Sequence, residues 1–512
     1  MKIERVKNAK KNITAGLILK IHQMLIPFLM RTAMIYFMGV EYLGLHSLFS
    51  SILHILNLAE LGVGSAMVFS MYKPIARDDG ATICALMRLY RKYYRLIGLL
   101  IGAVGLALTP VIPNLISGEI PAELSIYVLY LLNLGSTVLT YWLFAYKNCL
   151  LQAHQRTDVS SVITLITNSL QYVLQLIVLL VFKSYYLYAI TSMVTQAINN
   201  VCTAVVVTKM YPDYKPSGSL SKAETKKING RIRDLFTGKL GGVILSSSDT
   251  VVISSFLGLT VLAIYQNYYF MQTCIIGMIE IALTSVVAGL GNSFVTETKQ
   301  TNFENLEKFT FIFLWLTGVC TCCFLGMYQP FMEVWVGKEL MLDFSAVICF
   351  AIYFFVYTYF RFVNVYKDAA GLWHIDRFRP LVGAAVNLVL NLLCVRRFGI
   401  YGVILSTVLA IVLVSMPWLF RNLFTGFFEL SRLKGYLKQV LLFAGAVLLA
   451  GVLVCMICAW IKAGPWLRLV LNGLVCVTVP NIVFYLVFRK NRLYALSVRF
   501  VVHMAKQKMG KG

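Results

Sequence analysis

The sequence has little charge. Charged residues make up 13% of its 512 positions, whereas hydrophobic residues make up 59%. The mean hydropathy of +0.76 is more apolar than the core of a water-soluble domain requires. Apolar runs of about 20 residues, the length that crosses a bilayer as a helix, recur from end to end. These features exclude a soluble globular enzyme and predict an all-α protein that crosses the membrane many times.

Motifs for metal ions and for ATP are absent from the sequence. The twelve cysteines lie almost all in apolar runs, where thiols behave as small hydrophobic side chains, and they lack the spacing of metal ligands. No G-x-x-x-x-G-K-S/T loop occurs, so direct use of ATP is not expected. The loops predicted outside the membrane are short, which argues against a glycosyltransferase or polymerase with a catalytic loop. We therefore expect a protein without a cofactor that moves a substrate and catalyses no reaction.

Breaks between the apolar runs predict about fourteen transmembrane helices. Their approximate ranges are 12–38, 44–71, 93–112, 123–146, 158–182, 186–208, 237–257, 261–290, 309–330, 344–366, 380–395, 400–420, 438–461 and 467–488.

Acidic residues are scarce, with 22 Asp and Glu against 46 Lys and Arg. With the N-terminus inside, about 37 of these Lys and Arg fall on the cytoplasmic side and about 6 outside, as the positive-inside rule requires. The basic segment 1–11 precedes an apolar run without a cleavage site, so we expect it to be retained. The net charge of +24 therefore indicates orientation, with both termini in the cytoplasm, and does not indicate nucleic-acid binding.

Short motifs of the first half recur in the second at an offset of about 220 residues, as in many transporters. The pairs are 37–39 with 256–258, 43–45 with 262–264, 62–65 with 289–292, Lys147 with Lys367, and His154 with His374. Because the repeat holds six helices, an even number, the halves are parallel, and two further helices follow them. The predicted domains are a six-helix lobe at 1–208, a cytoplasmic linker at 209–236, a second six-helix lobe at 237–420, and two extra helices with a basic tail at 421–512.

Two stretches carry a likeness to a known family. They are LAELGVGSA at 58–66, leading to Pro74, and KDAAGLWHIDRFRP at 367–380, with Gly399-Ile-Tyr-Gly-Val403 beyond it. Both resemble the polysaccharide flippase family of the multidrug/oligosaccharidyl-lipid/polysaccharide (MOP) exporter superfamily. The members that they resemble are encoded in bacterial capsule and exopolysaccharide gene clusters. The likeness spans essentially the whole chain.

This resemblance implies a MATE-like fold and a flippase of the bacterial cytoplasmic membrane. The implied substrate is an undecaprenyl-pyrophosphate-linked oligosaccharide repeat unit, destined for capsule, exopolysaccharide or O-antigen-type polysaccharide. The implied partners are this lipid-linked oligosaccharide, membrane lipids and, as a candidate, a polysaccharide polymerase. Two alternatives from the same superfamily remain open: a cation-coupled multidrug exporter and a flippase for a peptidoglycan lipid precursor. An exporter of cations should have an acidic site, whereas acids and bases are equally numerous within the predicted helices.

Charges inside the bilayer are costly, so they should face a protein interior or a wet cavity. The candidates are Lys20, Arg31, Glu60, Asp249, Glu280 and Arg361. Lys20 and Arg31 are eleven residues apart, which places them on one helix face. Both are candidate substrate ligands, and Arg31 is a candidate for the pyrophosphate, because its planar guanidinium can pair with two oxygens at once. The alternatives are a permanent ion pair for Arg31 and an interfacial position for Lys20.

Glu60, Asp249 and Glu280 are the candidates for gating or for coupling to H⁺ or Na⁺. Glu60 is a possible partner of Arg31. By the repeat offset, Asp249 aligns with the position next to Arg31, so the two halves would present opposite charges at matching depth. Such a pair would be a gate opened by an anionic substrate or a static salt bridge, and the static interpretation is slightly favoured.

Two predicted helix faces carry hydroxyl, aromatic and charged side chains at helical spacing. Their members are Tyr269, Thr273, Gly277, Glu280 and Thr284 on one helix, and Tyr353, Tyr357, Arg361 and Asn364 on another. Such faces suit sugar hydroxyls and rings, so Tyr269, Thr273, Glu280, Tyr357 and Arg361 are predicted substrate ligands. Interfacial anchoring is the favoured alternative for Arg361.

A charged loop follows the tenth predicted helix on the cytoplasmic side. It contains Lys367, Asp368, His374, Asp376, Arg377 and Arg379. These residues would either collect an anionic lipid headgroup at a cytoplasmic entrance or fix the conformation of the loop, and the second interpretation is favoured.

Overall fold

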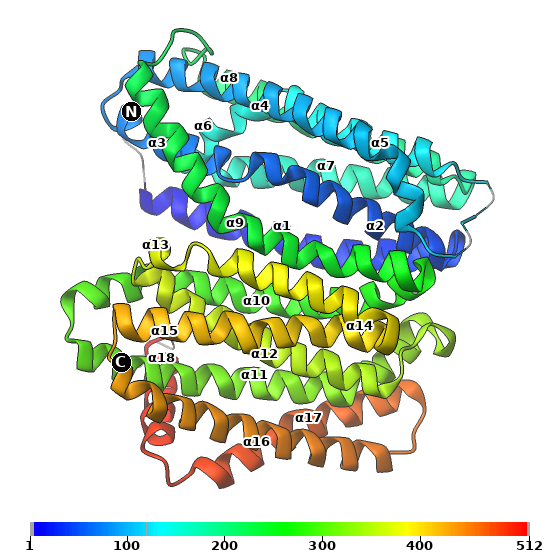
Figure 1. The fold of residues 1–512 in the computed structure, drawn as a ribbon, viewed down its shortest axis with the longest axis vertical. Helices are drawn as coiled ribbons and strands as arrows, with labels where there is room; N and C mark the ends of the chain where they lie inside the picture. Colours follow the sequence, from blue (N-terminus) through cyan, green and yellow to red (C-terminus); the bar gives the residue numbers. More distant parts are fainter. Residues whose placement is uncertain (1–4, 119, 122, 509–512) are drawn as a thin grey trace. The chain divides into compact units, whose positions relative to one another are not determined.

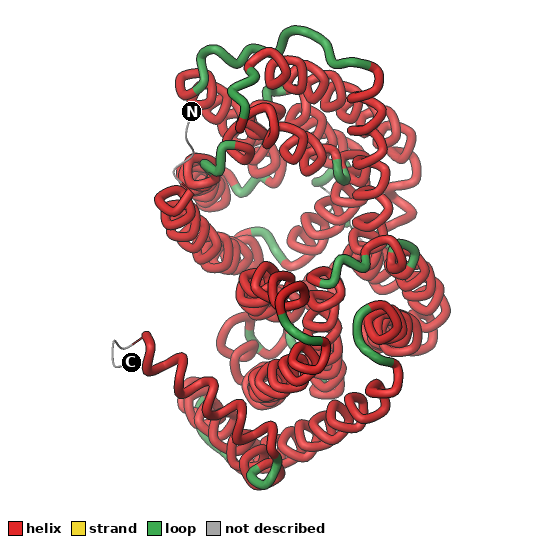
Figure 2. The backbone as a smooth tube through the Cα atoms, turned by 90° about the vertical axis from the view of Figure 1, so that its left-hand side faces the viewer, coloured by secondary structure: helices red, strands yellow, loops and turns green. Residues whose placement is uncertain are grey.

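The computed structural model describes residues 5–118, 120, 121 and 123–508, and the regular elements within these ranges are all helices (Figures 1 and 2). The predicted all-α fold is therefore confirmed. The chain forms two compact units, Met1–Ala263 and Ile264–Gly512.

The first unit contains nine α-helices and four short 3₁₀ or π segments among its described residues (Figure 1). In chain order they are α1 (Arg5–Phe37), α2 (Val40–Leu56), η1 (Asn57–Glu60), α3 (Val63–Ala76), α4 (Gly80–Leu108), η2 (Thr109–Leu115), α5 (Ile126–Trp142), η3 (Ala145–Lys147), α6 (Asn148–Ala153), α7 (Thr157–Ile177), η4 (Val178–Phe182), α8 (Tyr185–Met210) and α9 (Lys222–Leu257).

The second unit follows with α10, whose first residues still belong to the first unit. Its elements are α10 (Leu259–Thr296), α11 (Lys299–Val336), η5 (Lys338–Leu340), α12 (Phe344–Ala369), α13 (Trp373–Asp376), α14 (Arg379–Ala410), η6 (Ile411–Ser415), α15 (Met416–Gly426), η7 (Leu430–Arg432), α16 (Leu433–Trp460), α17 (Pro465–Phe488) and α18 (Arg492–Lys508).

The α14 segment is a hairpin of two membrane spans. Gly399 has φ 54° and ψ −133°, which no helix interior contains, and the chain reverses there. The Asn387 amide consequently donates to the Thr407 hydroxyl at 2.8 Å, across the two arms. By length and hydropathy the described residues hold twelve candidate spans, with α13 to α15 counted as one, and a thirteenth if the bent segment α5–α6 is a single span. Dividing the α14 hairpin at Gly399 gives fourteen, as the apolar runs predict.

Turns with positive φ mark the internal repeat. Gly39, Gly118 and Lys183 interrupt the helices of the first half with φ of 121°, 89° and 46°. Gly258, Gly337 and Gly399 have φ of 89°, 80° and 54° and follow in the same order, at offsets of 219, 219 and 216 residues. L-residues disfavour this region, so the matching turns are a shared feature of the two halves and not a consequence of composition.

The two halves differ where the second predicted helix ends. In the first half this helix is broken into α2, η1 and α3, whereas α10 continues without interruption. Gly62 ends the break with φ 89°, and a Cβ atom at this position would lie 2.7 Å from the Leu235 Cβ and 3.0 Å from the Ile232 carbonyl oxygen of α9. Only glycine fits such a close approach at positive φ. The break leaves Glu60 at the end of a short 3₁₀ turn.

The unit boundary lies further along the chain than the lobe boundary expected from the repeat. α9 begins at Lys222, inside the expected linker 209–236, and it packs with α2 and α3 of the first unit. The division of the chain into lobes at 1–208 and 237–420 stays a prediction.

The last two long helices pack on α11. The Trp315 indole of α11 donates to the Asn481 side chain of α17 at 2.7 Å, and the Asn472 amide donates to the Gly326 carbonyl at 2.8 Å. α16 lies beside both of these helices (Figure 1). The predicted C-terminal pair is therefore α16 and α17, followed by the basic helix α18.

Candidate functional site

An ion pair joins α10 to α12 in the second unit. The Nε atom of Arg361 lies 2.7 Å from Oε1 of Glu280, and the two side chains are 43% and 35% exposed. At 1.5 Å per residue, Arg361 lies about 26 Å along α12 from its first residue, Phe344. Both residues were predicted as substrate ligands, and the structure brings them into contact.

Four tyrosines on the same two helices form a tyrosine ladder, defined here as Tyr265, Tyr269, Tyr353 and Tyr357. Ring centroids of successive pairs are 5.6, 6.2 and 5.4 Å apart, and the first and last pairs are stacked. Such spacings are typical of favourable aromatic contacts. The ladder crosses from α10 to α12, and Tyr357 is one helical turn before Arg361.

The hydroxyls expected beside this ladder are used within α10 itself. Thr273 donates to the Phe270 carbonyl, and Thr284 donates to the carbonyl of Glu280, both at 2.8 Å. Each oxygen still has acceptor capacity. Of the five predicted ligands on these helices, Tyr269, Tyr357, Glu280 and Arg361 form a connected aromatic and ionic face, and Thr273 contributes a hydroxyl acceptor on α10.

Lys20 and Arg31 lie on α1, in the first unit, and both are half-buried. This helix contains Pro27 and packs on α7, where the His22 ring is 3.0 Å from the Ser169 hydroxyl. Binding of pyrophosphate by Arg31 and contact of Lys20 with the substrate stay predictions.

Tyrosine hydroxyls surround Glu60 in the first unit. Tyr94 donates to its Oε1 atom, and Tyr141 donates to Oε2 at 2.7 Å. Tyr90 in turn donates to Tyr94 at 2.6 Å, and the hydroxyl of Tyr141 also lies 3.0 Å from the side-chain amide oxygen of Asn57. Hydroxyl donors therefore reach both oxygens of this side chain. Sequence analysis missed these partners, because tyrosines of α4 and α5 meet η1 only in the folded unit.

Asp249 lies in a buried polar strip of α9. It is 8% exposed, and its neighbours Ser247, Ser248 and Thr250 are also buried. The Ser247 hydroxyl is 3.1 Å from Nδ1 of His54 on α2. Through Ser247, this polar strip contacts α2, which packs against α9.

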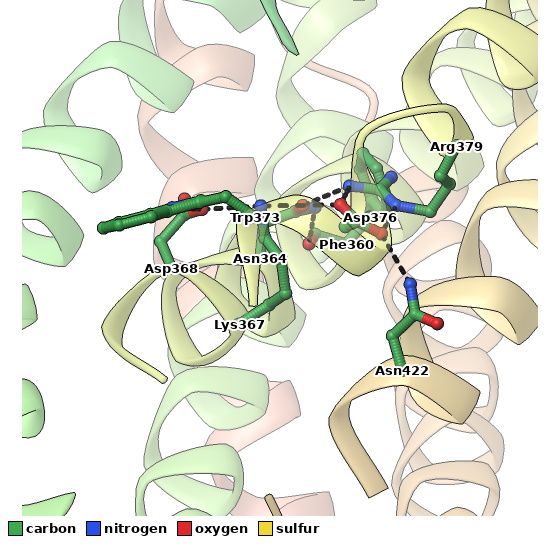
Figure 3. Close-up of polar contacts among 8 residues, drawn as sticks. All are labelled: Phe360, Asn364, Lys367, Asp368, Trp373, Asp376, Arg379 and Asn422. Carbon is green, nitrogen blue, oxygen red and sulfur yellow. Dashed lines mark hydrogen bonds and ion pairs between the residues drawn. The ribbon is translucent and has the colours of Figure 1, made fainter. Parts of the chain in front are cut away.

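A buried network holds the loop that was considered as a cytoplasmic entrance (Figure 3). Arg379 contacts both carboxylate oxygens of Asp376 at 2.7 Å, and both residues are 3% exposed. The Lys367 ammonium lies 3.4 Å from Oδ2 of Asp376, and the Asn422 side-chain amide of α15 donates to Oδ1 of Asp376 at 3.0 Å. Arg379 also donates to the Asn364 side chain at 2.7 Å. We call these five residues the inner-loop network, and a fully bonded network of this kind rigidifies the loop.

The other charged residues of this loop face outward. His374 and Arg377 are exposed, and Arg377 lies over the Phe378 ring. Asp368 pairs with Lys367 at 2.6 Å and accepts from the Trp373 indole at 3.1 Å. In this arrangement Lys367, Asp376 and Arg379 fix the loop, while His374 and Arg377 remain accessible. Asn422 gave no sequence signal because it is 46 residues from its partner.

The matching position in the first half has different surroundings. His154 is 4% exposed, packs 4.4 Å from the Tyr211 ring, and its Nδ1 atom lies 2.9 Å from the Leu150 carbonyl oxygen. Burial lowers the pKa of His154 from its usual 6.5. The repeated histidines therefore share a place in the sequence and not an environment.

The fold is that of a known class of membrane transport proteins. The structure described as the lipid II flippase MurJ, in an inward closed conformation, aligns with 94% of this chain and 99% of its own, at a TM-score of 0.68 and 13% identity. An inward-facing multidrug resistance MATE family transporter of the MOP superfamily aligns with 82% of this chain and 99% of its own, at a TM-score of 0.56 and 13% identity. A variant of the Vibrio cholerae MATE transporter VcmN aligns with 85% of this chain and 98% of its own, at a TM-score of 0.54 and 15% identity. The chain is a multi-pass membrane protein with the transporter fold of the MOP superfamily.

The sequence places the chain in one family. The profile of the family described as polysaccharide biosynthesis protein matches residues 9–288, more than half of the chain. A search of the curated protein sequences finds no match to this chain. The chain belongs to the polysaccharide biosynthesis protein family, and the resemblance in its motifs is confirmed.

Proposed function

We propose that this protein is a flippase for undecaprenyl-pyrophosphate-linked oligosaccharide repeat units. It moves them from the cytoplasmic to the outer leaflet of the bacterial cytoplasmic membrane by alternating access. The products supply a surface polysaccharide such as capsule, exopolysaccharide or O-antigen. Membership of the polysaccharide biosynthesis family supports the substrate class, and the MOP-type fold supports transport.

The observation that carries the proposal is the face formed by the tyrosine ladder and the Glu280–Arg361 ion pair. Charges on spanning helices face a protein interior or a wet cavity, and this pair is more than one-third exposed. Sugar rings stack on aromatic rings, and their hydroxyls donate to carboxylates and accept from guanidinium groups. Tyr265 and Tyr353 are buried, whereas Tyr269 and Tyr357 are partly exposed, so these two rings and the ion pair offer the contacts for an oligosaccharide.

Arg31 and Lys20 are the proposed ligands of the pyrophosphate. A guanidinium keeps its charge when desolvated and pairs with two phosphate oxygens. Glu60, Asp249 and Glu280 are the proposed sites for coupling to H⁺ or Na⁺. The Lys and Arg distribution supports termini in the cytoplasm.

The test is export of surface polysaccharide in cells that lack the gene and carry variants of it. We expect Arg31→Ala to abolish export at normal protein levels, and Arg361→Gln to reduce it at least about tenfold, because a charge-assisted hydrogen bond contributes about 1.5–3 kcal/mol. Arg421→Gln, which removes one exposed charge from α15, is the matched control and should export normally. Full export in Arg31→Ala would contradict the assignment of Arg31 as a ligand.

A charge exchange separates substrate binding from a static ion pair. Glu280→Arg combined with Arg361→Glu preserves the pair but reverses which helix carries each charge. If the pair is only structural, the double variant recovers export. We expect it to fold and to remain defective.

The MurJ likeness supports a second candidate, a flippase for a peptidoglycan lipid precursor. This function predicts that loss of the gene blocks cell-wall synthesis and growth. The proposed function predicts growth with loss of surface polysaccharide alone.

A further inference from the structure

A basic groove lies at one end of the first unit and shares no lining residue with the predicted transport site. Its volume is about 510 Å³, and it is formed by α4 and the segment 218–225 that leads into α9. Arg88, Arg91, Lys92 and Arg95 line it, and its described lining contains no acidic residue. The lining is therefore a concentration of positive charge, and the one carboxylate of the segment 218–225, Glu224, is outside it and accepts from the Ser221 hydroxyl at 2.7 Å and the Ser221 backbone N–H at 3.1 Å.

The four cations occupy one face of α4. Their spacings of three, one and three residues place them within an arc of about 100°, over a rise of about 10 Å. Like charges at these spacings destabilise a helix. One guanidinium nitrogen of Arg88 donates to the Gly218 carbonyl at 2.8 Å, which closes the groove on the side of the loop. An anion in the groove would relieve the repulsion.

The groove lies at the depth of lipid headgroups. The lipid-facing surface of α4 begins directly after Arg95, where Leu96 and Leu99 are 64% and 61% exposed. The indole of Trp142 at the end of α5 donates to the Arg95 carbonyl at 3.2 Å and is half-exposed, as is typical of the tryptophans at membrane interfaces. The headgroup layer is about 5–7 Å thick on each side of the hydrocarbon, so a rise of about 10 Å from Arg95 to Arg88 crosses this layer and reaches the water beyond it.

We propose that this groove binds the phosphate headgroup of an anionic phospholipid from the cytoplasmic leaflet. The guanidinium groups pair with the phosphate oxygens, and the acyl chains lie along the leucines that follow Arg95. The bound headgroup joins α4 to the start of α9. Because this site is separate from the transport face, it can be correct or wrong independently of the proposed function.

The test is native mass spectrometry of the purified full chain with phosphatidylglycerol and with phosphatidylcholine of the same acyl chains. We expect the chain to retain phosphatidylglycerol preferentially. Each Lys or Arg near an anionic surface is worth about fivefold in binding, so Arg91→Gln with Arg95→Gln should weaken this binding about 25-fold. Arg88 is left in place because it holds the loop.

The matched control removes two exposed charges from the second unit, by Arg421→Gln with Lys434→Gln. We expect it to bind phosphatidylglycerol as the unaltered chain does. Equal losses in the two double variants, or equal retention of the two lipids, would overturn the site. Binding of inorganic phosphate as tight as that of phosphatidylglycerol would overturn the assignment to a lipid.

Discussion

Replacing Asp376 with asparagine tests whether the inner loop of the second unit depends on a buried charge. In the structure Asp376 is the common partner of Arg379, Lys367 and Asn422. The substitution keeps the size of the side chain but leaves the guanidinium of Arg379, which is 3% exposed, without its counter-charge. Removing one partner of a buried ion pair costs about 3–5 kcal/mol. For a unit of this size the melting temperature should fall on the order of 10 °C.

Thermal unfolding of the purified chain in one detergent measures this effect. Asp368→Asn is the matched control, because this carboxylate also contacts Lys367 but is 44% exposed. Surface ion pairs contribute about 1 kcal/mol or less, so the control should unfold almost as the unaltered chain does. If the two variants lose the same small amount, the inner-loop network does not stabilise the loop.

A compensated variant extends the test. Asp376→Leu combined with Arg379→Met replaces this buried ion pair with apolar side chains of similar volume, and the buried Lys367 keeps Asp368 as its partner at 2.6 Å. Such replacements are often neutral in stability. We expect this variant to recover most of the stability lost in Asp376→Asn. Continued instability would show that the polar contacts themselves, and not an unpaired charge, maintain the loop.

Three further predictions follow from single positions. Gly62→Ala should destabilise the first unit by at least about 1–2 kcal/mol, measured by thermal unfolding, because φ is 89° and the new Cβ meets Leu235 of α9. Burial lowers the pKa of His154 below its unfolded value of 6.5, so the unfolded state binds more protons than the folded state as pH falls through that range, and stability should decrease there. His154→Phe should therefore reduce the change of melting temperature between pH 7 and pH 5. An unchanged pH profile of the melting temperature would refute the argument. Glu280→Gln should reduce polysaccharide export while leaving the amount of folded protein unchanged, and normal export would remove Glu280 from the proposed site.

The membrane fold was predictable because lipid imposes a strong and local requirement. Each span must satisfy its own backbone hydrogen bonds and present apolar side chains, so hydropathy alone located the helices. The repeat was also visible, because the turns at Gly39 and Gly258 need glycine and carry similar flanking residues. The unit boundary was not predictable, since it depends on α9 packing against α2 and α3.

The candidate site was only partly predictable, because it also depends on packing between helices that are distant in the sequence. Helical spacing collected Glu280 with Tyr269 and Arg361 with Tyr357 on separate faces, but nothing in the sequence showed that these faces meet. Glu60 was identified because a charged side chain inside a bilayer is costly. Its hydroxyl partners were not identified, because they lie 34 and 81 residues away in the sequence. Tertiary contacts of this range leave no periodic signal in one sequence.

The most direct test of the central claim is transport by the purified chain in proteoliposomes. The substrate is an undecaprenyl-pyrophosphate-linked oligosaccharide placed in one leaflet, and its appearance in the other leaflet is followed with an impermeant lectin or glycosidase. We predict transfer by the unaltered chain and loss of transfer in Arg361→Gln, with Arg421→Gln as the active control. No transfer of this lipid, together with export of small organic cations, would contradict the account.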